Sequence, residues 1–371
     1  SISSSVQTAL VYGQATIMAS ASCLLLLSIF LLAGQATQGG GEARPLVPAV
    51  FIFGDSLVDV GNNNYLHTIA KANTPPYGRD FKDHVATGRF CNGKIFSDFI
   101  AEKVGFNSSP PAYLSPQASG RNLLLGANFA SAASGYYNHE FLFISISFYK
   151  QLKHFKEYQS KLAAFAGSSQ ARSIVSGSLY IICAGSCDFG LNYYINPFLW
   201  LLRNSEQFAD HLLTIFSRIV AQLYDTGARR IGVFSLPPLG CFPSAMTVYG
   251  HGKSGCVPRL NNDARYYNMR LNATVGSISD KYHDLKIAIL DMYTPLYRLS
   301  TDPQSLGFTE AKRACCGTGT LETSSLMCNL LTPGTCRNAQ TYVYWDSGHP
   351  SEAANKVVVD YFAADIKNLV A

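Results

Sequence analysis

The 371-residue chain is poor in charged residues, and its charges form no cluster of one sign. Only 14% of the residues are Asp, Glu, Lys or Arg, whereas 47% are hydrophobic. This balance excludes a disordered chain and indicates a large buried core. The net charge of +5 is spread out without a run of five basic residues, so the sequence predicts no nucleic-acid partner.

Long hydrophobic runs are also missing, because no stretch reaches eighteen uninterrupted apolar residues. We therefore expect no stable membrane anchor. Met18 is followed by the short apolar stretch 23–33 and by the small residues Gly34 and Ala36, a pattern typical of a cleaved signal peptide. No Lys or Arg precedes this stretch, so an uncleaved anchor is the alternative. The predicted organisation is an upstream non-native extension at 1–17, a signal peptide at 18–36, a flexible tail at 37–46 and a single domain at 47–371.

The ten cysteines include no Cys-x-x-Cys pair and no nearby pair of histidines with the spacing of zinc ligands. We interpret six of them as disulfide-forming in an oxidising compartment: Cys241 with Cys256 around a glycine-rich loop, and a later group whose pairing the spacing leaves open. That group consists of Cys315, Cys316, Cys328 and Cys336. The remaining cysteines of the domain, Cys91, Cys183 and Cys187, are predicted to be thiols. Asn107 and Asn272 begin glycosylation sequences, which agrees with secretion.

The chain has no G-x-S-x-G, the motif that carries the nucleophile in many α/β hydrolases. It does have Ser56, which follows the apolar run Val50–Phe53 at a predicted strand-to-helix turn, where parallel sheets place reactive groups. A serine becomes nucleophilic when an imidazole takes its proton and a carboxylate orients that imidazole. Asp346 and His349 are three residues apart and can meet on one side of a turn. Ser56, His349 and Asp346 are the candidate catalytic residues.

Five short β-rich runs alternate with helical patterns, which predicts an α/β fold with a parallel sheet. The predicted strands are Ala49–Phe53, Leu123–Phe129, Leu179–Ala184, Arg230–Ser235 and Lys286–Leu290. The predicted helices are Gln151–Ala166, Ser205–Thr226 with Ser205 as N-cap, Asn262–Lys281 and Ser351–Leu369. The ligand site of such a sheet lies at the carboxyl ends of its strands.

Four blocks in a fixed order resemble the plant-type GDSL esterases/lipases, a group within the SGNH hydrolases, and the resemblance runs from about Pro48 to the C-terminus. The blocks are Gly54-Asp55-Ser56-Leu57 with Asp59, Gly61 and Asn62–Asn64; Gly126–Ser131 with Gly135; Ala184–Phe189 with Asn192–Tyr194; and Trp345-Asp346 with His349–Asn355.

The resemblance implies a three-layer αβα, flavodoxin-like fold with a central five-stranded parallel sheet in the order 2-1-3-4-5. It also implies an oxyanion hole formed by Ser56, Gly135 and a third donor. Relatives usually have asparagine as this third donor, whereas this chain has Cys187, whose thiol is a weak donor. Ala132 and Ala133 stand where glycines are common; an alanine N–H donates equally well if no positive φ is needed.

The expected function is that of a secreted serine hydrolase of the apoplast or cell wall, which cleaves small-molecule or lipid esters as a monomer without a cofactor. An acyltransferase with the same triad is one alternative. A binding protein weakened by Cys187 is another. Asp55, Asp59 and Asp188 could suggest a glycosidase, but capping and loop hydrogen bonds are their more common roles.

Overall fold

The computed structural model describes residues 44–137, 144–251, 255–318, 322, 326, 328–332 and 334–371. A compact unit spans Pro45–Ala371. The predicted extension, signal peptide and most of the predicted tail therefore lie outside the described residues. Leu46, the last residue of that tail, donates its N–H to Val104 O at 2.9 Å.

A five-stranded parallel sheet forms the centre, in the order β2-β1-β3-β4-β5. This confirms the expected order. The strands are β1 (Val50–Gly54), β2 (Gly126–Asn128), β3 (Leu179–Cys183), β4 (Arg230–Phe234) and β5 (Lys286–Leu290). The prediction for β2 was too long, because Gly120–Leu125 forms a 3₁₀ helix whose N–H groups bond within the turn and not to β1.

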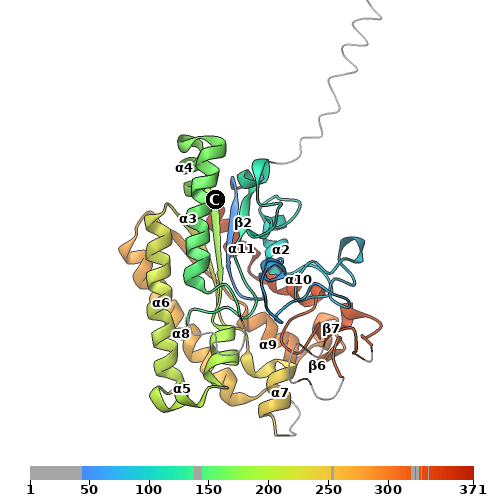
Figure 1. Cartoon of the computed structure of the whole chain (residues 1–371). Coiled ribbons are helices and arrows are strands. Elements are labelled where there is room, and N and C mark those ends of the chain that lie inside the picture. Colours follow the sequence, from blue (N-terminus) through green and yellow to red (C-terminus); the bar gives the residue numbers. More distant parts are fainter. Residues whose placement is uncertain are drawn as a thin grey trace, which may run out of the picture. The chain divides into compact units, whose positions relative to one another are not determined.

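Helices cover both faces of the sheet, which gives the expected three layers (Figure 1). One layer contains α3 (Phe148–Ala166), α4 (Ser168–Gly177), α6 (Ser205–Asp225) and α8 (Pro258–Lys281). The other contains α2 (Phe96–Lys103), α10 (Glu352–Tyr361) and α11 (Ala363–Val370), with α9 (Tyr293–Thr301) packed on α10. The short helices α5 (Pro197–Leu202) and α7 (Pro243–Tyr249) lie at the end of the molecule opposite α4.

Shorter elements lie among the described residues as well. Strands β6 (Glu310–Ala314) and β7 (Tyr342–Tyr344) form a separate parallel pair. A π-helical turn follows β3 at Asp188–Tyr193. The remaining 3₁₀ turns are Asn62–Tyr65, Lys82–His84, Leu239–Cys241, Gln304–Leu306 and Ala339–Thr341.

Several details of the predicted helices were wrong. Helices α3 and α8 begin earlier than the predicted Gln151 and Asn262, at Phe148 and Pro258. The N-cap of α6 is Asn204, whose side chain accepts the N–H of Gln207 at 2.8 Å, and Ser205 is the first helical residue. The predicted C-terminal helix is two helices that separate at Phe362. This residue is fully buried and its ring contacts Phe234 of β4, so the chain bends to insert it into the core.

The core is rich in aromatic side chains where α3 packs on β1. Phe51 and Phe53 alternate with aliphatic residues along β1, and both rings contact Phe155 of α3 at centroid distances of 5.1 and 5.6 Å. All three are fully buried or nearly so. Aromatic pairs at such distances stabilise a core beyond the burial of their area, so β1 is anchored immediately before Ser56.

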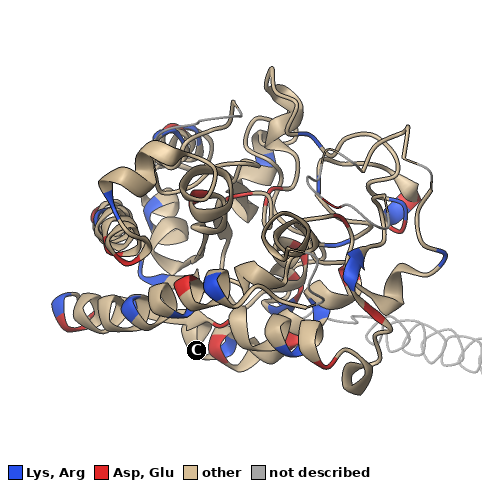
Figure 2. Ribbon diagram, turned by 90° about the horizontal axis from the view of Figure 1, so that it is seen from below, with Lys and Arg blue, Asp and Glu red and all other residues tan. Residues whose placement is uncertain are grey.

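Charges are dispersed over the surface. Lys and Arg are interspersed with Asp and Glu over many elements in the view of Figure 2. Among the described residues, no helix has the length and apolar character needed to cross a membrane.

Candidate active site

The turn that carries Ser56 is fixed by its backbone. Gly54 has φ 147°, and a Cβ there would lie 2.0 Å from Cys183 O, so only glycine fits between β1 and β3. Gln151 of α3 accepts the Gly54 N–H and donates to Gly54 O, both at 2.9 Å. The Gly54 peptide, which precedes the Ser56 turn, is therefore held by Gln151 on α3 and packed closely against β3.

Asp55 fixes the next residues of the turn. Its carboxylate accepts the N–H of Leu57 and the hydroxyl of Ser186, each at 3.0 Å. The side chain is completely buried, and this burial raises the pKa of Asp55 to about 6. Asp55 therefore connects the Ser56 turn to the loop after β3.

Ser56, His349 and Asp346 form one hydrogen-bonded chain. His349 Nε2 lies 2.7 Å from Ser56 Oγ, and His349 Nδ1 lies 2.7 and 2.9 Å from the two carboxylate oxygens of Asp346. Asp346 is fully buried, whereas Ser56 and His349 each keep 8% of their surface exposed. An imidazole that donates from Nδ1 to a carboxylate presents an Nε2 lone pair to the serine hydroxyl.

The segment that carries Asp346 and His349 is a tight turn. The Trp345 N–H donates to His349 O, and the Gly348 N–H donates to Asp346 Oδ1, both at 2.8 Å. The N–H groups of Cys315 and Cys316 donate to Tyr344 O and Trp345 O, so the cysteine-rich segment lies directly beside this turn.

Three disulfides join the six predicted cysteines, and Cys91, Cys183 and Cys187 are free thiols as predicted. The structure resolves the pairing that the sequence left open: Cys241–Cys256, Cys315–Cys336 and Cys316–Cys328. Both C-terminal disulfides therefore attach their loops to the residues that neighbour the Asp346 turn.

The loop after β2 lies beside the Ser56 turn, because Ser131 N–H donates to Gly54 O at 3.0 Å. Within this loop Gly135 packs against Asp188: a Cβ at Gly135 would lie 2.5 Å from its carboxylate oxygens. That carboxylate accepts the N–H groups of Tyr136 and Tyr137 at 2.8 and 2.7 Å. Burial raises the pKa of Asp188 to about 7. Within the described residues, neither Ser56 N–H nor Gly135 N–H donates a hydrogen bond.

Ala133 and Cys187 meet near this loop. Ala133 has φ 68°, so the condition under which an alanine could replace glycine without strain is not met. The Cys187 thiol lies beside the Asp55 carboxylate and the Ala133 N–H, and burial raises the pKa of the thiol well above its ordinary value. The thiol is therefore protonated at neutral pH.

Comparison with known proteins gives a consistent result. A model of the GDSL-like lipase/acylhydrolase family matches residues 50–362. The GDSL esterase/lipase APG of Arabidopsis thaliana is 55% identical over 314 residues, which cover 84% of this chain and 89% of that protein. From the same plant, the GDSL esterase/lipase At5g22810 is 54% identical over 323 residues, covering 86% and 89%, and the GDSL esterase/lipase At5g03820 is 49% identical over 340 residues, covering 91% and 96%.

The chain belongs to the GDSL lipase/acylhydrolase family. This confirms the resemblance inferred from the four blocks, and membership places the protein among the ester hydrolases. All the candidate residues of the GDSL site lie at the carboxyl ends of β1, β2 and β3 or in the turn after β7.

Two residues that shape this GDSL site were not singled out from the sequence: Tyr77 donates its hydroxyl to Asp346 Oδ2 at 2.8 Å, and Gln151 holds Gly54. Asp59 bonds loop N–H groups as expected: it accepts those of Gly61, Asn62 and Ala132, which connects the first block to the second. Tyr77 and Gln151 lie 269 and 97 residues from their partners, and no local pattern marks them.

The two glycosylation candidates lie on the surface. Asn107 is exposed in a loop after α2, and Asn272 is exposed on α8. Both side chains are therefore accessible to modification in the folded protein.

Proposed function

We propose that this chain is a secreted serine hydrolase that cleaves carboxylic esters through an acyl-enzyme. The observation that carries the proposal is the continuous hydrogen-bonded chain from Ser56 Oγ through the His349 imidazole to the Asp346 carboxylate. A hydroxyl, a base and an orienting acid in this geometry match the requirements of nucleophilic acyl transfer.

In the first half-reaction, Ser56 Oγ attacks the acyl carbon while His349 Nε2 accepts the hydroxyl proton. The imidazolium then donates this proton to the departing alcohol. A water molecule, activated by the same nitrogen, hydrolyses the acyl-enzyme in the second half-reaction. The buried carboxylate of Asp346 fixes the tautomer of His349 and stabilises its positive charge.

The oxyanion that forms on the acyl carbon needs hydrogen-bond donors. We assign this role to the backbone N–H of Ser56 and of the Gly135 loop, with Cys187 at the position of the third donor. The support is that the Ser56 and Gly135 N–H groups donate to no other atom among the described residues, and that Cys187 faces the same loop.

Restoring an amide at the third position tests this assignment. Cys187→Asn should raise kcat by up to about 10²–10³-fold, since removal of one oxyanion donor costs about that factor in other serine hydrolases. The effect should appear in kcat more than in KM, because the oxyanion exists only near the transition state. Steady-state kinetics with a short-chain ester measure it, and Cys187→Ala is the matched control without a donor. Equal turnover in all three forms would argue that position 187 lies outside the oxyanion hole.

The proposal includes an extracellular location, the apoplast or cell wall. Three disulfides suit an oxidising compartment, and the relatives are plant proteins. Glycans on Asn107 or Asn272 and removal of residues 18–36 are part of this proposal. N-terminal sequencing and glycosidase treatment of the protein secreted by plant cells test them; a mature chain that begins at Ser1 would contradict secretion through this signal.

Hydrolysis of p-nitrophenyl esters of graded acyl length by the wild type and Ser56→Ala tests the main proposal. The variant should lose at least about 10³-fold in kcat and keep its melting temperature, because one small hydroxyl is removed. A fluorophosphonate should add its phosphonyl group to Ser56 in the wild type, as detected by peptide mass spectrometry. The label should be absent from Ser56→Ala. Retention of more than a tenth of the wild-type turnover would refute the assignment.

A further inference from the structure

Asp346 has a partner from the N-terminal part of the chain. The Tyr77 hydroxyl donates to Asp346 Oδ2 at 2.8 Å, while Asp346 Oδ1 accepts the Gly348 N–H at 2.8 Å and His349 Nδ1 lies within 2.9 Å of both oxygens. Tyr77 is 3% exposed and Asp346 is fully buried. A buried carboxylate stays ionised only when donors replace the water that it has lost.

The ring of Tyr77 is fixed by packing. It contacts Phe90 edge-on at a centroid distance of 5.6 Å and Trp345, the residue before Asp346, at 6.4 Å. Phe90 also packs on the imidazole of His349 at 4.8 Å. Phe90 and Trp345 therefore pack against Tyr77 while they also contact or adjoin His349 and Asp346. This packing leaves the Tyr77 hydroxyl little freedom to move away from Asp346.

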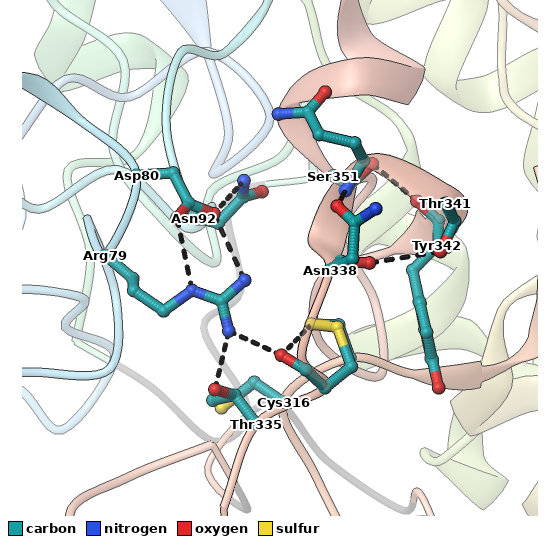
Figure 3. The surroundings of a disulfide bond; sticks show 12 residues. Arg79, Asp80, Asn92, Cys316, Thr335, Asn338, Thr341, Tyr342 and Ser351 are labelled. Carbon is teal, nitrogen blue, oxygen red and sulfur yellow. Dashed lines mark hydrogen bonds and ion pairs between the residues drawn. A yellow bond between two sulfur atoms is a disulfide. The ribbon is translucent and has the colours of Figure 1, made fainter.

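The backbone around Tyr77 is attached to the disulfide loop. Arg79 donates to Thr335 Oγ1 at 2.6 Å and to Cys336 O at 2.8 Å, and its guanidinium lies over the Trp345 ring at 5.1 Å. Asp80 pairs with Arg79 and accepts the side-chain amide of Asn92 (Figure 3). These contacts place the 77–80 segment between the body of the protein and the cross-linked loop.

The Tyr77 hydroxyl remains a donor throughout the working pH range. Burial, and then the negative charge of Asp346, raise the pKa of Tyr77 well above its ordinary value. A protonated phenol can donate to the carboxylate but cannot compete with it for the His349 proton.

We propose that Tyr77 is a positioning residue of the triad, whose hydroxyl holds the Asp346 carboxylate in the orientation that faces His349. This inference rests on the proposed function. In this role Tyr77 acts through its hydrogen bond to Asp346. It makes the catalytic unit a chain of four side chains contributed by three distant segments: Tyr77, Ser56 and the turn with Asp346 and His349.

The experiment compares Tyr77→Phe with Tyr180→Phe. Tyr77→Phe keeps the ring and its packing and removes only the hydroxyl. Tyr180 is an equally buried tyrosine at the start of β3 whose hydroxyl donates to Val175 O at 2.9 Å, away from the triad, so its variant controls for the general cost of losing a buried hydroxyl.

Tyr77→Phe should lower kcat about tenfold, the effect of one lost hydrogen bond to a charged group, with KM changed less than about twofold. The acid limb of its kcat/KM profile, which reports protonation of the catalytic base, should move to higher pH, because an Asp346 carboxylate without the Tyr77 donor attracts the imidazolium more strongly. Tyr180→Phe should keep the wild-type kcat and acid limb. Tyr77→Met, which fills a similar volume without a donor, gives the same test if Tyr77→Phe does not fold.

Wild-type kcat and an unmoved acid limb in folded Tyr77→Phe or Tyr77→Met would overturn the inference. An equal loss of kcat in Tyr180→Phe would also overturn it, since the effect would then be one of general stability. Ser56→Ala, assayed in parallel, separates this failure from that of the proposed function, because an active Ser56→Ala would contradict the proposed function itself.

Discussion

The proposed nucleophile and the proposed acid–base pair of this site are held by different means. Ser56 follows a central strand of the parallel sheet, and the peptide before it is fixed by β3, by Gln151 and by the packing of α3. Asp346 and His349 lie after the short strand β7, outside that sheet, beside a loop closed by two disulfides. The first half is held by buried hydrogen bonds and packing alone, whereas the second combines hydrogen bonds with covalent cross-links.

This difference follows from the surroundings of the two segments. The central sheet is covered on both faces, so close packing and ladder hydrogen bonds suffice to orient a turn at its edge. The two-stranded β6–β7 pair has too few strands to be independently stable. The two disulfides, the Arg79 hydrogen bonds and the rings of Tyr77 and Phe90 hold this pair and the following turn in place. We therefore expect perturbation of the first half to change mainly stability, and perturbation of the second half to lower both stability and activity.

Removal of the Cys315–Cys336 disulfide should have the largest effect. The double variant Cys315→Ser with Cys336→Ser opens a loop of 21 residues, which in the chain-entropy model costs about 3 kcal/mol. Cys315, directly after β6 and beside the Asp346 turn, would lose its covalent attachment to Cys336. We therefore expect kcat to fall at least tenfold even at temperatures where the protein is folded. Thermal melts and kcat measured on the same samples check both effects.

The matched control is Cys241→Ser with Cys256→Ser, which opens a loop of 15 residues. This loop reaches the triad turn through the Ser244 N–H, which donates to Ser347 O at 2.9 Å. A similar loss of stability with a smaller loss of kcat is expected. If both double variants lost kcat equally, the disulfides would stabilise the whole fold and would have no particular role at the acid–base turn.

Replacement of Gln151 tests the half of the site that carries Ser56. Gln151→Leu leaves the buried Gly54 N–H without a partner, whereas Gly54 O still accepts the Ser131 N–H, and an unsatisfied buried group costs about 1–3 kcal/mol. Stability should fall by about 1–3 kcal/mol while kcat falls less than tenfold, because β3 still holds the turn. Urea denaturation with parallel kinetics measures both. Gln159→Leu, on the same helix and partly exposed, is the control with an expected cost below about 1 kcal/mol.

Acidification should have the smallest effect on stability, and this effect should come from Asp188, which lies on the Ser56 side of the site. The folded pKa of Asp188 is raised by burial to about 7, so the folded state binds a proton more tightly than the unfolded state between about pH 4 and 7. The stability from this group is therefore present at low pH and is lost as the pH rises through about 7. In Asp188→Asn the gain in melting temperature between pH 7.5 and pH 5 should shrink by about 2–4 °C.

Asp284 provides a control whose pKa shift has the opposite sign. The Tyr224 hydroxyl lowers the pKa of this exposed carboxyl, so its contribution is present at neutral pH and is lost on acidification. Between pH 7.5 and pH 5 Asp284→Asn should therefore keep the wild-type change in melting temperature, because this carboxyl takes up a proton only below about pH 4. An equal reduction of the gain in both variants would show that burial of Asp188 is not the cause.

The fold was predictable because its signals are local and repeated. Apolar runs of five residues separated by helical periodicity indicate parallel strands, and four of the five strands begin and end within one residue of the predicted positions. The order of the strands came from the resemblance to the family. The boundaries failed where tertiary contacts override local pattern: Phe362 interrupts the last helix because the core accepts its ring, and the residues before β2 bond among themselves.

The amino-acid sequence was sufficient to name Ser56, Asp346 and His349 as candidates, because each belongs to a short motif whose residue types and spacing serve one chemistry. It could not place Ala133 at a positive φ, pair the four C-terminal cysteines, or bring Tyr77 and Gln151 to their partners. Those features depend on segments far apart in the chain that meet only when the core closes. A hydrogen bond between such segments leaves no periodicity in either of them, so its existence was fixed by the packing of the folded protein.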